Sequence, residues 1–138
     1  MAEHKQRFGA LANVGWILVF LMAALQLVYA LYAYLDPSAF SLTRGTELFD
    51  LGDKDWVRIY ASRTLFVGLI VGYLLYARQF KILAMASLLG IVMPVTDALL
   101  AYQASADGSV VLKHVATALF LAVTFIVLRT VVRRGQSA

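Results

Sequence analysis

The chain has 138 residues, of which 62% are hydrophobic and only 14% are charged. A soluble domain of this length has too little interior to bury so much apolar surface, so we expect the lipid bilayer to act as its solvent. The net charge is +4, but the basic residues lie near the ends of apolar segments, which favours an orientation signal over nucleic-acid binding. The chain has no cysteine, which excludes disulfides, iron–sulfur clusters and Cys₄ zinc sites.

Four apolar segments predict transmembrane helices at residues 9–34, 56–77, 82–102 and 110–132. About 20 residues rising ~1.5 Å each cross the ~30 Å hydrocarbon core of a bilayer. Residues 36–55 are predicted to form a polar loop on the outer side, long enough to act as a lid, with an amphipathic turn or two on the membrane surface within residues 41–52. Residues 1–138 are expected to form one domain, an all-α integral membrane protein folded as an antiparallel four-helix bundle.

The charged residues predict how this bundle lies in the membrane. One side of the four predicted helices carries the basic residues Lys5, Arg7, Arg78, Lys81, Arg129, Arg133 and Arg134. The other side carries the acidic residues Asp36, Glu47, Asp50, Asp53, Asp55 and Asp107. By the positive-inside rule, both the N-terminus and the C-terminus are expected to be cytoplasmic.

Polar residues inside the predicted helices fall at one depth. Gln26, Arg63, Asp97 and His114 each lie roughly 8–12 Å below the outer end of their helix, at ~1.5 Å per residue. An arginine at such a position costs about 2.5–3.5 kcal/mol or more unless it is paired or hydrated, so Arg63 calls for a partner. Pro94 lies one turn before Asp97 and predicts a kink that opens a cavity there.

The preferred interpretation of this layer is a binding site for a small amphipathic molecule such as a lipid, a quinone or an isoprenoid-like compound. Its polar end is expected on Arg63, Asp97 and His114, and its tail among Tyr29, Tyr60 and Phe66. At helical spacing the full set of expected ligand-binding residues is Gln26, Tyr29, Tyr60, Arg63, Phe66, Asp97, His114 and Thr117.

Two alternatives stay open. In the first, the protein is an enzyme in which Asp97 or His114 acts as acid or base and Arg63 stabilises developing negative charge. In the second, it is a structural subunit of a larger membrane complex, with Arg63 and Asp97 as a structural ion pair. Transport is less favoured, because only one half of the membrane would contain polar residues.

The sequence predicts no metal and no cofactor. His4 is expected in the cytoplasmic tail and His114 in the outer half of the membrane, so they cannot both ligate one haem within a monomer. Asp97 with His114 offers only two ligands, and there is no phosphate loop or dinucleotide fingerprint. Gly68 and Gly72, spaced as small-xxx-small, predict a close helix contact within the bundle or in a homodimer.

The run RxxxxGLxxG from Arg63 to Gly72, followed by an aspartate in the third helix and a histidine in the fourth, resembles the DoxX-like group of small bacterial four-helix membrane proteins. This resemblance implies the antiparallel bundle, a location in the bacterial inner membrane, and Arg63 as a functional position. DoxX itself is associated with quinone-linked oxidation of sulfur compounds. That activity is not carried over, and the resemblance identifies no substrate.

Overall fold

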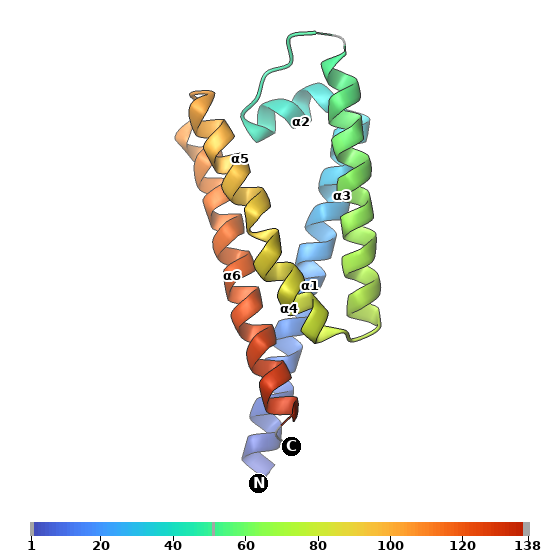
Figure 1. The fold of residues 1–138 in the computed structure, drawn as a ribbon, viewed down its shortest axis with the longest axis vertical. Coiled ribbons are helices and arrows are strands. Elements are labelled where there is room, and N and C mark those ends of the chain that lie inside the picture. The colour runs from blue at the N-terminus through green and yellow to red at the C-terminus, as the bar shows by residue number, and fades with distance from the viewer. Residues whose placement is uncertain (1, 51, 137–138) are drawn as a thin grey trace.

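A computed structural model describes residues 2–50 and 52–136, and its side chains from residue 9 to residue 135 apart from residue 51. Throughout these residues the regular structure is helical, and no strand is present in them. The helices are α1 (Ala2–Leu35), α2 (Pro37–Arg44), α3 (Asp53–Tyr76), α4 (Phe80–Gly90), α5 (Val92–Gln103) and α6 (Gly108–Gln136). Both termini lie at one end of the molecule and the short helix α2 lies near the other (Figure 1).

Four stretches are long and apolar enough to cross a membrane: Gly9–Leu35, Asp53–Tyr76, Phe80–Gln103 and Gly108–Gly135. Only 22–28% of the residues in their most apolar windows are buried inside the molecule. The remaining apolar side chains face outwards, where water would be an unfavourable surrounding. The chain is therefore a multi-pass membrane protein, as its composition predicts.

The helix boundaries differ from the predicted ones in one respect that matters for the site. The third apolar segment is two helices, α4 and α5, joined at Ile91. The N–H of Ile91 bonds the carbonyl of Leu88 at 3.3 Å in a tightened turn, and Pro94 has no N–H to offer the carbonyl of Gly90. The break therefore lies one turn before the proline that predicts it. The other long helices differ from their predicted ends by a few residues: α3 begins three residues earlier and ends one residue earlier, α6 is longer at both ends, and α1 begins at Ala2.

The prediction of a polar loop over residues 36–55 is wrong in its first half, because residues 37–44 form α2. The carboxylate of Asp36 caps this helix by accepting the N–H of Ala39 at 3.0 Å, and Pro37 occupies the first helical position. At the far end Gly45 has φ +85° and its N–H bonds the carbonyl of Leu42 at 3.0 Å. This left-handed conformation is one that only glycine adopts readily, and it ends the helix immediately after Arg44.

The packing of the helices leaves α3 and α5 apart from each other. α1 packs along α3 and α6, and α6 packs along α4 and α5. α3 also contacts α2 and α4, but it has no packed interface with α5 over the residues described. In Figure 1, α3 and α5 diverge from the α3–α4 turn towards α2, which lies across the wide end.

Two hydrophobic clusters lie at different heights. The larger one includes Val19, Val71, Leu83 and Leu128 and lies towards the termini, whereas the smaller one is built on Ala33, Phe40 and Ala61 and lies beside α2.

Gly68 and Gly72 have different surroundings, which bears on the predicted glycine contact. A Cβ added to Gly68 would lie 2.9 Å from Leu27 Cδ2 and 3.3 Å from Gln26 Cβ. This close approach of α3 to α1 lies inside the bundle, so Gly68 is not available to a second copy of the chain. Nothing lies within 4 Å of a Cβ added to Gly72. The homodimer expected through these two glycines stays a prediction for Gly72 alone.

Candidate functional site

A cavity of about 380 Å³ lies between the two hydrophobic clusters. Residues of α1, α2, α3, α5 and α6 line it, and α4 contributes none. Its polar wall includes Gln26, Tyr29, Arg44, Arg63, Asp97 and His114. Its apolar wall includes Met22, Leu25, Val67, Met93, Phe120 and Leu121. Four of these, Met22, Val67, Phe120 and Leu121, belong to the larger cluster or pack against it. The cavity thus has a polar part towards α2 and an apolar part towards the termini.

The structure brings most of the predicted ligand-binding residues to this cavity. Gln26, Tyr29, Tyr60, Arg63, Asp97, His114 and Thr117 all line it. Phe66 does not, and its side chain is 63% exposed on the outer surface of α3. The inward stripe of α3 runs through Tyr60, Thr64 and Val67, so a residue three positions beyond Arg63 is turned away from the cavity. The structure therefore does not place Phe66 in the cavity, and its expected contact with a ligand tail stays a prediction.

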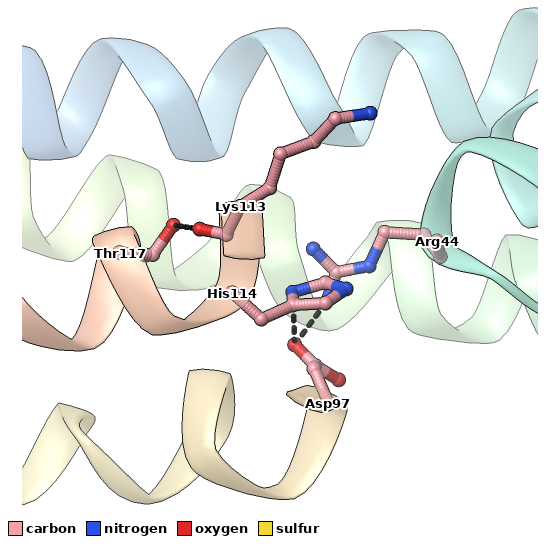
Figure 2. A network of polar contacts seen from close by, with 5 residues as sticks. All are labelled: Arg44, Asp97, Lys113, His114 and Thr117. Carbon is pink, nitrogen blue, oxygen red and sulfur yellow. Dashed lines mark hydrogen bonds and ion pairs between the residues drawn. The ribbon is translucent and has the colours of Figure 1, made fainter. Parts of the chain in front are cut away.

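Three side chains from three helices meet at the α2 end of the cavity. Figure 2 shows the guanidinium of Arg44, the carboxylate of Asp97 and the imidazole of His114 lying against one another. Arg44 Nη2 donates a hydrogen bond to Asp97 Oδ2 in an ion pair. Nδ1 of His114 lies 3.9 Å from the same oxygen, too far for a hydrogen bond. Asp97 thus links the end of α2 to α5 and faces α6.

The guanidinium of Arg44 also contacts three aromatic rings. Its guanidinium carbon lies 5.6 Å from the ring centroid of Tyr29, 5.9 Å from that of Phe40 and 5.8 Å from that of Tyr60. Cation–π contacts of this kind contribute about 0.5–1 kcal/mol each at partly exposed sites. The charge of Arg44 is therefore held in place by a carboxylate and three rings, and its side chain is only 16% exposed.

Arg63 is not the partner of Asp97, so the structural ion pair considered from the sequence is wrong. The side chain of Arg63 is exposed and lies at the edge of the cavity. Among the ion pairs and hydrogen bonds within the described part of the chain, none involves Arg63. Because Arg44 and Asp97 neutralise each other, Arg63 leaves the cavity with one uncompensated positive charge.

His114 has an unmet hydrogen-bonding requirement. Its side chain is 6% exposed, and Nε2 is buried with no hydrogen-bond partner within the described residues. The backbone carbonyl of Arg44 lies close to the imidazole without satisfying Nε2. A buried nitrogen left without a partner costs about 1–3 kcal/mol. A ligand in the cavity could provide the missing partner.

The hydroxyl of Thr117, one turn further along α6, donates to the carbonyl of Lys113 at 2.9 Å (Figure 2). It retains only its acceptor capacity for a ligand.

A second cavity of about 410 Å³ lies on the α2 side of the ion pair. Arg44, Tyr60 and Asp97 line both cavities. Glu47 and Trp56 line only the second one. The Arg44–Asp97 pair therefore forms part of the wall between them.

The described residues contain no group of three or more His, Cys, Asp or Glu side chains placed to hold a metal ion. Asp97 and His114 are the two potential ligands in the first cavity, and Asp97 is already paired with Arg44. The polar side chains at this site can take part in hydrogen bonding, charge pairing and proton transfer.

Comparison with known proteins places the chain in a family. Residues 23–128 match the family described as "Domain of unknown function (DUF4267)". The chain belongs to this family. The matched residues include every residue that lines the first cavity except Met22. No curated protein and no solved structure matches the chain. Membership of DUF4267 does not bear on the resemblance to DoxX-like proteins, which stays a prediction.

Arg44 is the site residue that sequence reasoning misses, although a signal for it exists. Asp36-Pro37 fits the end of the first helix, but the same pair is equally typical of an N-cap followed by a proline at the first helical position. Gly45, eight residues after Pro37, marks the matching C-terminus. Interpreted together, these residues predict a two-turn helix whose last residue is Arg44.

Proposed function

We propose that this protein binds a small amphipathic molecule, such as a lipid, a quinone or an isoprenoid-like compound, in the cavity between its two hydrophobic clusters. The supporting observation is the division of the cavity wall into a polar part and an apolar part, with Arg63 uncompensated and Nε2 of His114 unpartnered. The head group would lie on Arg63, His114 and Gln26. Its apolar portion would extend along Val67, Met93 and Phe120.

The size of the cavity supports a small ligand. Ligand pockets usually enclose about 300–1,000 Å³, and about 380 Å³ is near the lower limit of that range. A space of this size holds a head group and the first part of a chain. It does not enclose a whole two-chain lipid.

The proposed setting is the bacterial inner membrane, with an antiparallel four-helix bundle and both termini in the cytoplasm. The distribution of charge supports this orientation. Arg78 and Lys81 lie at the α3–α4 turn, and Arg129 and Arg134 lie in the last turns of α6, whereas Glu47 and Asp50 follow α2 and Asp107 directly precedes α6. In Figure 1 the α3–α4 turn and the end of α6 are on the side of the termini, and α2 and the start of α6 are on the other side. By the positive-inside rule the cavity would then lie in the outer half of the bilayer, beneath α2.

Native mass spectrometry of the gently extracted protein tests the proposed binding. The wild type is compared with Arg63→Gln and with a control, Arg58→Gln, which removes an exposed arginine from the same helix. Arg58 lies outside the cavity lining and pairs with Asp55 at 3.2 Å. We expect one discrete bound mass in the wild type and in the control, and its loss from Arg63→Gln. If all three proteins release the same mixture of bulk lipids, the proposal is wrong.

A second candidate function, an enzyme acting on such a ligand, is favoured by one further observation. The carboxylate of Asp97 and the imidazole of His114 face each other across 3.9 Å in the cavity that also contains Arg63. A proton could pass between a ligand and His114, while Arg63 stabilises developing negative charge. Under this hypothesis Asp97→Asn would retain an unreacted ligand that differs in mass or fragmentation from the wild-type ligand. Identical bound species in both proteins would favour binding alone.

The third possibility, a structural subunit of a larger complex, depended on an ion pair between Arg63 and Asp97. Asp97 pairs with Arg44 instead, so no observation now favours that role.

A further inference from the structure

The side of the cavity between α3 and α5 is open to the surroundings of the protein. Several lining residues are buried: Met22 is 7% exposed, and Leu121 and Thr64 are each 6% exposed. Lining residues on the α3–α5 side are not, with Val92 65% and Met93 43% exposed. Because α3 and α5 have no packed interface, an opening leads from the cavity to the flank of the bundle, which is the face that the hydrocarbon of a bilayer would cover.

The α2 end of the cavity, in contrast, is held by specific contacts. The Arg44–Asp97 ion pair joins the end of α2 to α5. Directly after it, Gly45 is so close to α5 and its neighbours that an added Cβ would lie 2.9 Å from Ala106, 3.0 Å from Val110 and 3.2 Å from Ala101. This contact has no room for a methyl group, so the chain is closely packed where Gly45 meets α5 and the start of α6. The Arg44–Asp97 pair beside it forms part of the wall towards the second cavity.

The charge at the opening favours one sign of head group. Arg63 lines the cavity at its exposed edge and has no ionic partner among the described residues. Arg44 and Asp97 compensate each other, so the remaining field is positive. In a surrounding of low dielectric constant a single uncompensated charge strongly favours an opposite charge beside it.

From these observations we infer that the ligand comes sideways from the lipid phase between α3 and α5, and that it is an anionic single-chain amphiphile. This inference rests on the proposed binding function. The negatively charged head group, a carboxylate or a phosphate, pairs with Arg63. The chain lies along Val67 and Met93 and leaves the cavity through the opening towards the bilayer. α2 closes the cavity against water.

The route of access can be tested because the chain has no cysteine. Thr64→Cys places one thiol in the buried lining of the cavity. In reconstituted vesicles its reaction with a bilayer-partitioning N-alkyl maleimide is compared with its reaction with a charged, membrane-impermeant thiosulfonate. Each rate is normalised to a cysteine exposed to the same phase, Ile126→Cys for the lipid reagent and Gly52→Cys for the aqueous one. We expect the normalised lipid-phase rate to be at least about tenfold higher than the normalised aqueous rate, which corresponds to a difference of about 1.4 kcal/mol in activation free energy.

Thr124→Cys provides a matched control for general loosening of the protein. Thr124 is a fully buried threonine of α6 outside the cavity lining. Its thiol should stay unreactive towards both reagents. Faster aqueous labelling of the thiol at position 64, with position 124 still protected, would mean that ligands arrive past α2 and would overturn the lateral route.

The charge of the ligand is tested separately with three single-chain probes of equal length: palmitate, lysophosphatidate with a palmitoyl chain, and neutral monopalmitoylglycerol. We expect one or both anionic probes to bind at least about tenfold more tightly than the neutral one, and Arg63→Gln to remove this preference while Arg58→Gln keeps it. The stronger of the two anionic probes identifies the head group as carboxylate or phosphate. Equal binding of all three probes, unaffected by Arg63→Gln, would refute the inferred charge but leave the cavity as a binding site. Failure of every probe to bind, together with release of only the same mixture of bulk lipids from the wild type and from Arg63→Gln, would refute the proposed function itself.

Discussion

Replacing Arg44 by glutamine removes the ion pair between α2 and α5, and the cost of this substitution can be estimated from the contacts of Arg44. The ion pair with Asp97 is a charge-assisted hydrogen bond, a class that contributes about 1.5–3 kcal/mol. Contacts with three aromatic rings add about 0.5–1 kcal/mol for the best of them. The side chains of Arg44 and Asp97 are 16% and 30% exposed, so the roughly 3–5 kcal/mol of a fully buried pair is too high. We expect Arg44→Gln to lower the free energy of unfolding by about 2–4 kcal/mol.

The complementary variant should cost less. Asp97→Asn keeps a carbonyl oxygen that can accept from Arg44, and the guanidinium stays on its three rings. We therefore expect about 1–2 kcal/mol for Asp97→Asn and a coupling free energy of about 1–2 kcal/mol in the double-mutant cycle. The exchange Arg44→Asp with Asp97→Arg should recover only part of the loss, because the new arginine on α5 is no longer stacked on the rings of α1, α2 and α3.

The measurement is reversible unfolding in mixed micelles by increasing denaturing detergent, followed by circular dichroism and by amide exchange across residues 37–46. Loss of protection in this segment before global unfolding would show that α2 detaches first. A coupling free energy indistinguishable from zero, with equal losses from the two single variants, would refute the reasoning. Arg44 would then be a surface arginine with no specific hold on α5.

Three further predictions concern single positions. Gly45→Ala should loosen α2, because alanine is strained by about 1–2 kcal/mol at φ +85° and its methyl group would lie 2.9 Å from Ala106. Limited proteolysis after residue 44 should therefore be faster in the variant than in the wild type. An unchanged rate of cleavage would contradict this prediction. His114→Phe removes the unpartnered buried nitrogen Nε2 and keeps an aromatic ring, so the ligand-free variant should unfold at the same temperature as the wild type or at a higher one. The discrete bound mass should be lost from the variant. A large loss of stability would contradict the conclusion that Nε2 lacks a hydrogen-bond partner. The hydroxyl and the N–H of Ser109 bond the carboxylate of Asp107 and hold the pKa of Asp107 below its usual value. This cap of α6 is fully present above the ordinary carboxyl pKa and lost as pH falls through the lowered one, so the Ser109 amide signal should titrate below about pH 3.9; a midpoint above that would contradict the cap.

Hydropathy alone predicts the four spanning segments, because each requires only a long apolar run, and the bilayer leaves few other structures for such a run. The depth of polar residues along each helix is also predictable, since it depends only on the rise per residue. That is why Gln26, Asp97 and His114 meet in the cavity as the sequence suggests. Rotation about the helix axis is not predictable in the same way. On α3 the cavity-facing stripe is centred one residue away from the predicted position, so Phe66 faces away from the cavity and Arg63 lies at its edge.

The lid region is where sequence reasoning fails most clearly, for a physical reason. Residues 37–44 are too short and too polar to be recognised as a membrane element, and nothing in their composition indicates that they are buried. Yet Phe40 and Ser41 are both buried, because the diverging ends of α3 and α5 leave a gap that a two-turn helix fills. Whether such a gap exists depends on the break at Ile91 and on helix packing, neither of which a residue-by-residue pattern contains.

Because Asp97 pairs with Arg44, it does not compensate the charge of Arg63. If Asp97 compensated Arg63, the arginine in the membrane would be explained by structure alone, and a ligand would be unnecessary. With Asp97 occupied, an arginine about two turns inside a spanning helix retains its desolvation cost of about 2.5–3.5 kcal/mol or more. Only water, a lipid head group or a ligand at the open edge can offset that cost. Of these three, an anionic head group also explains why the arginine lines a cavity whose far wall is apolar and whose buried histidine lacks a partner. The unpaired arginine is thus the strongest argument that the cavity is filled in the membrane.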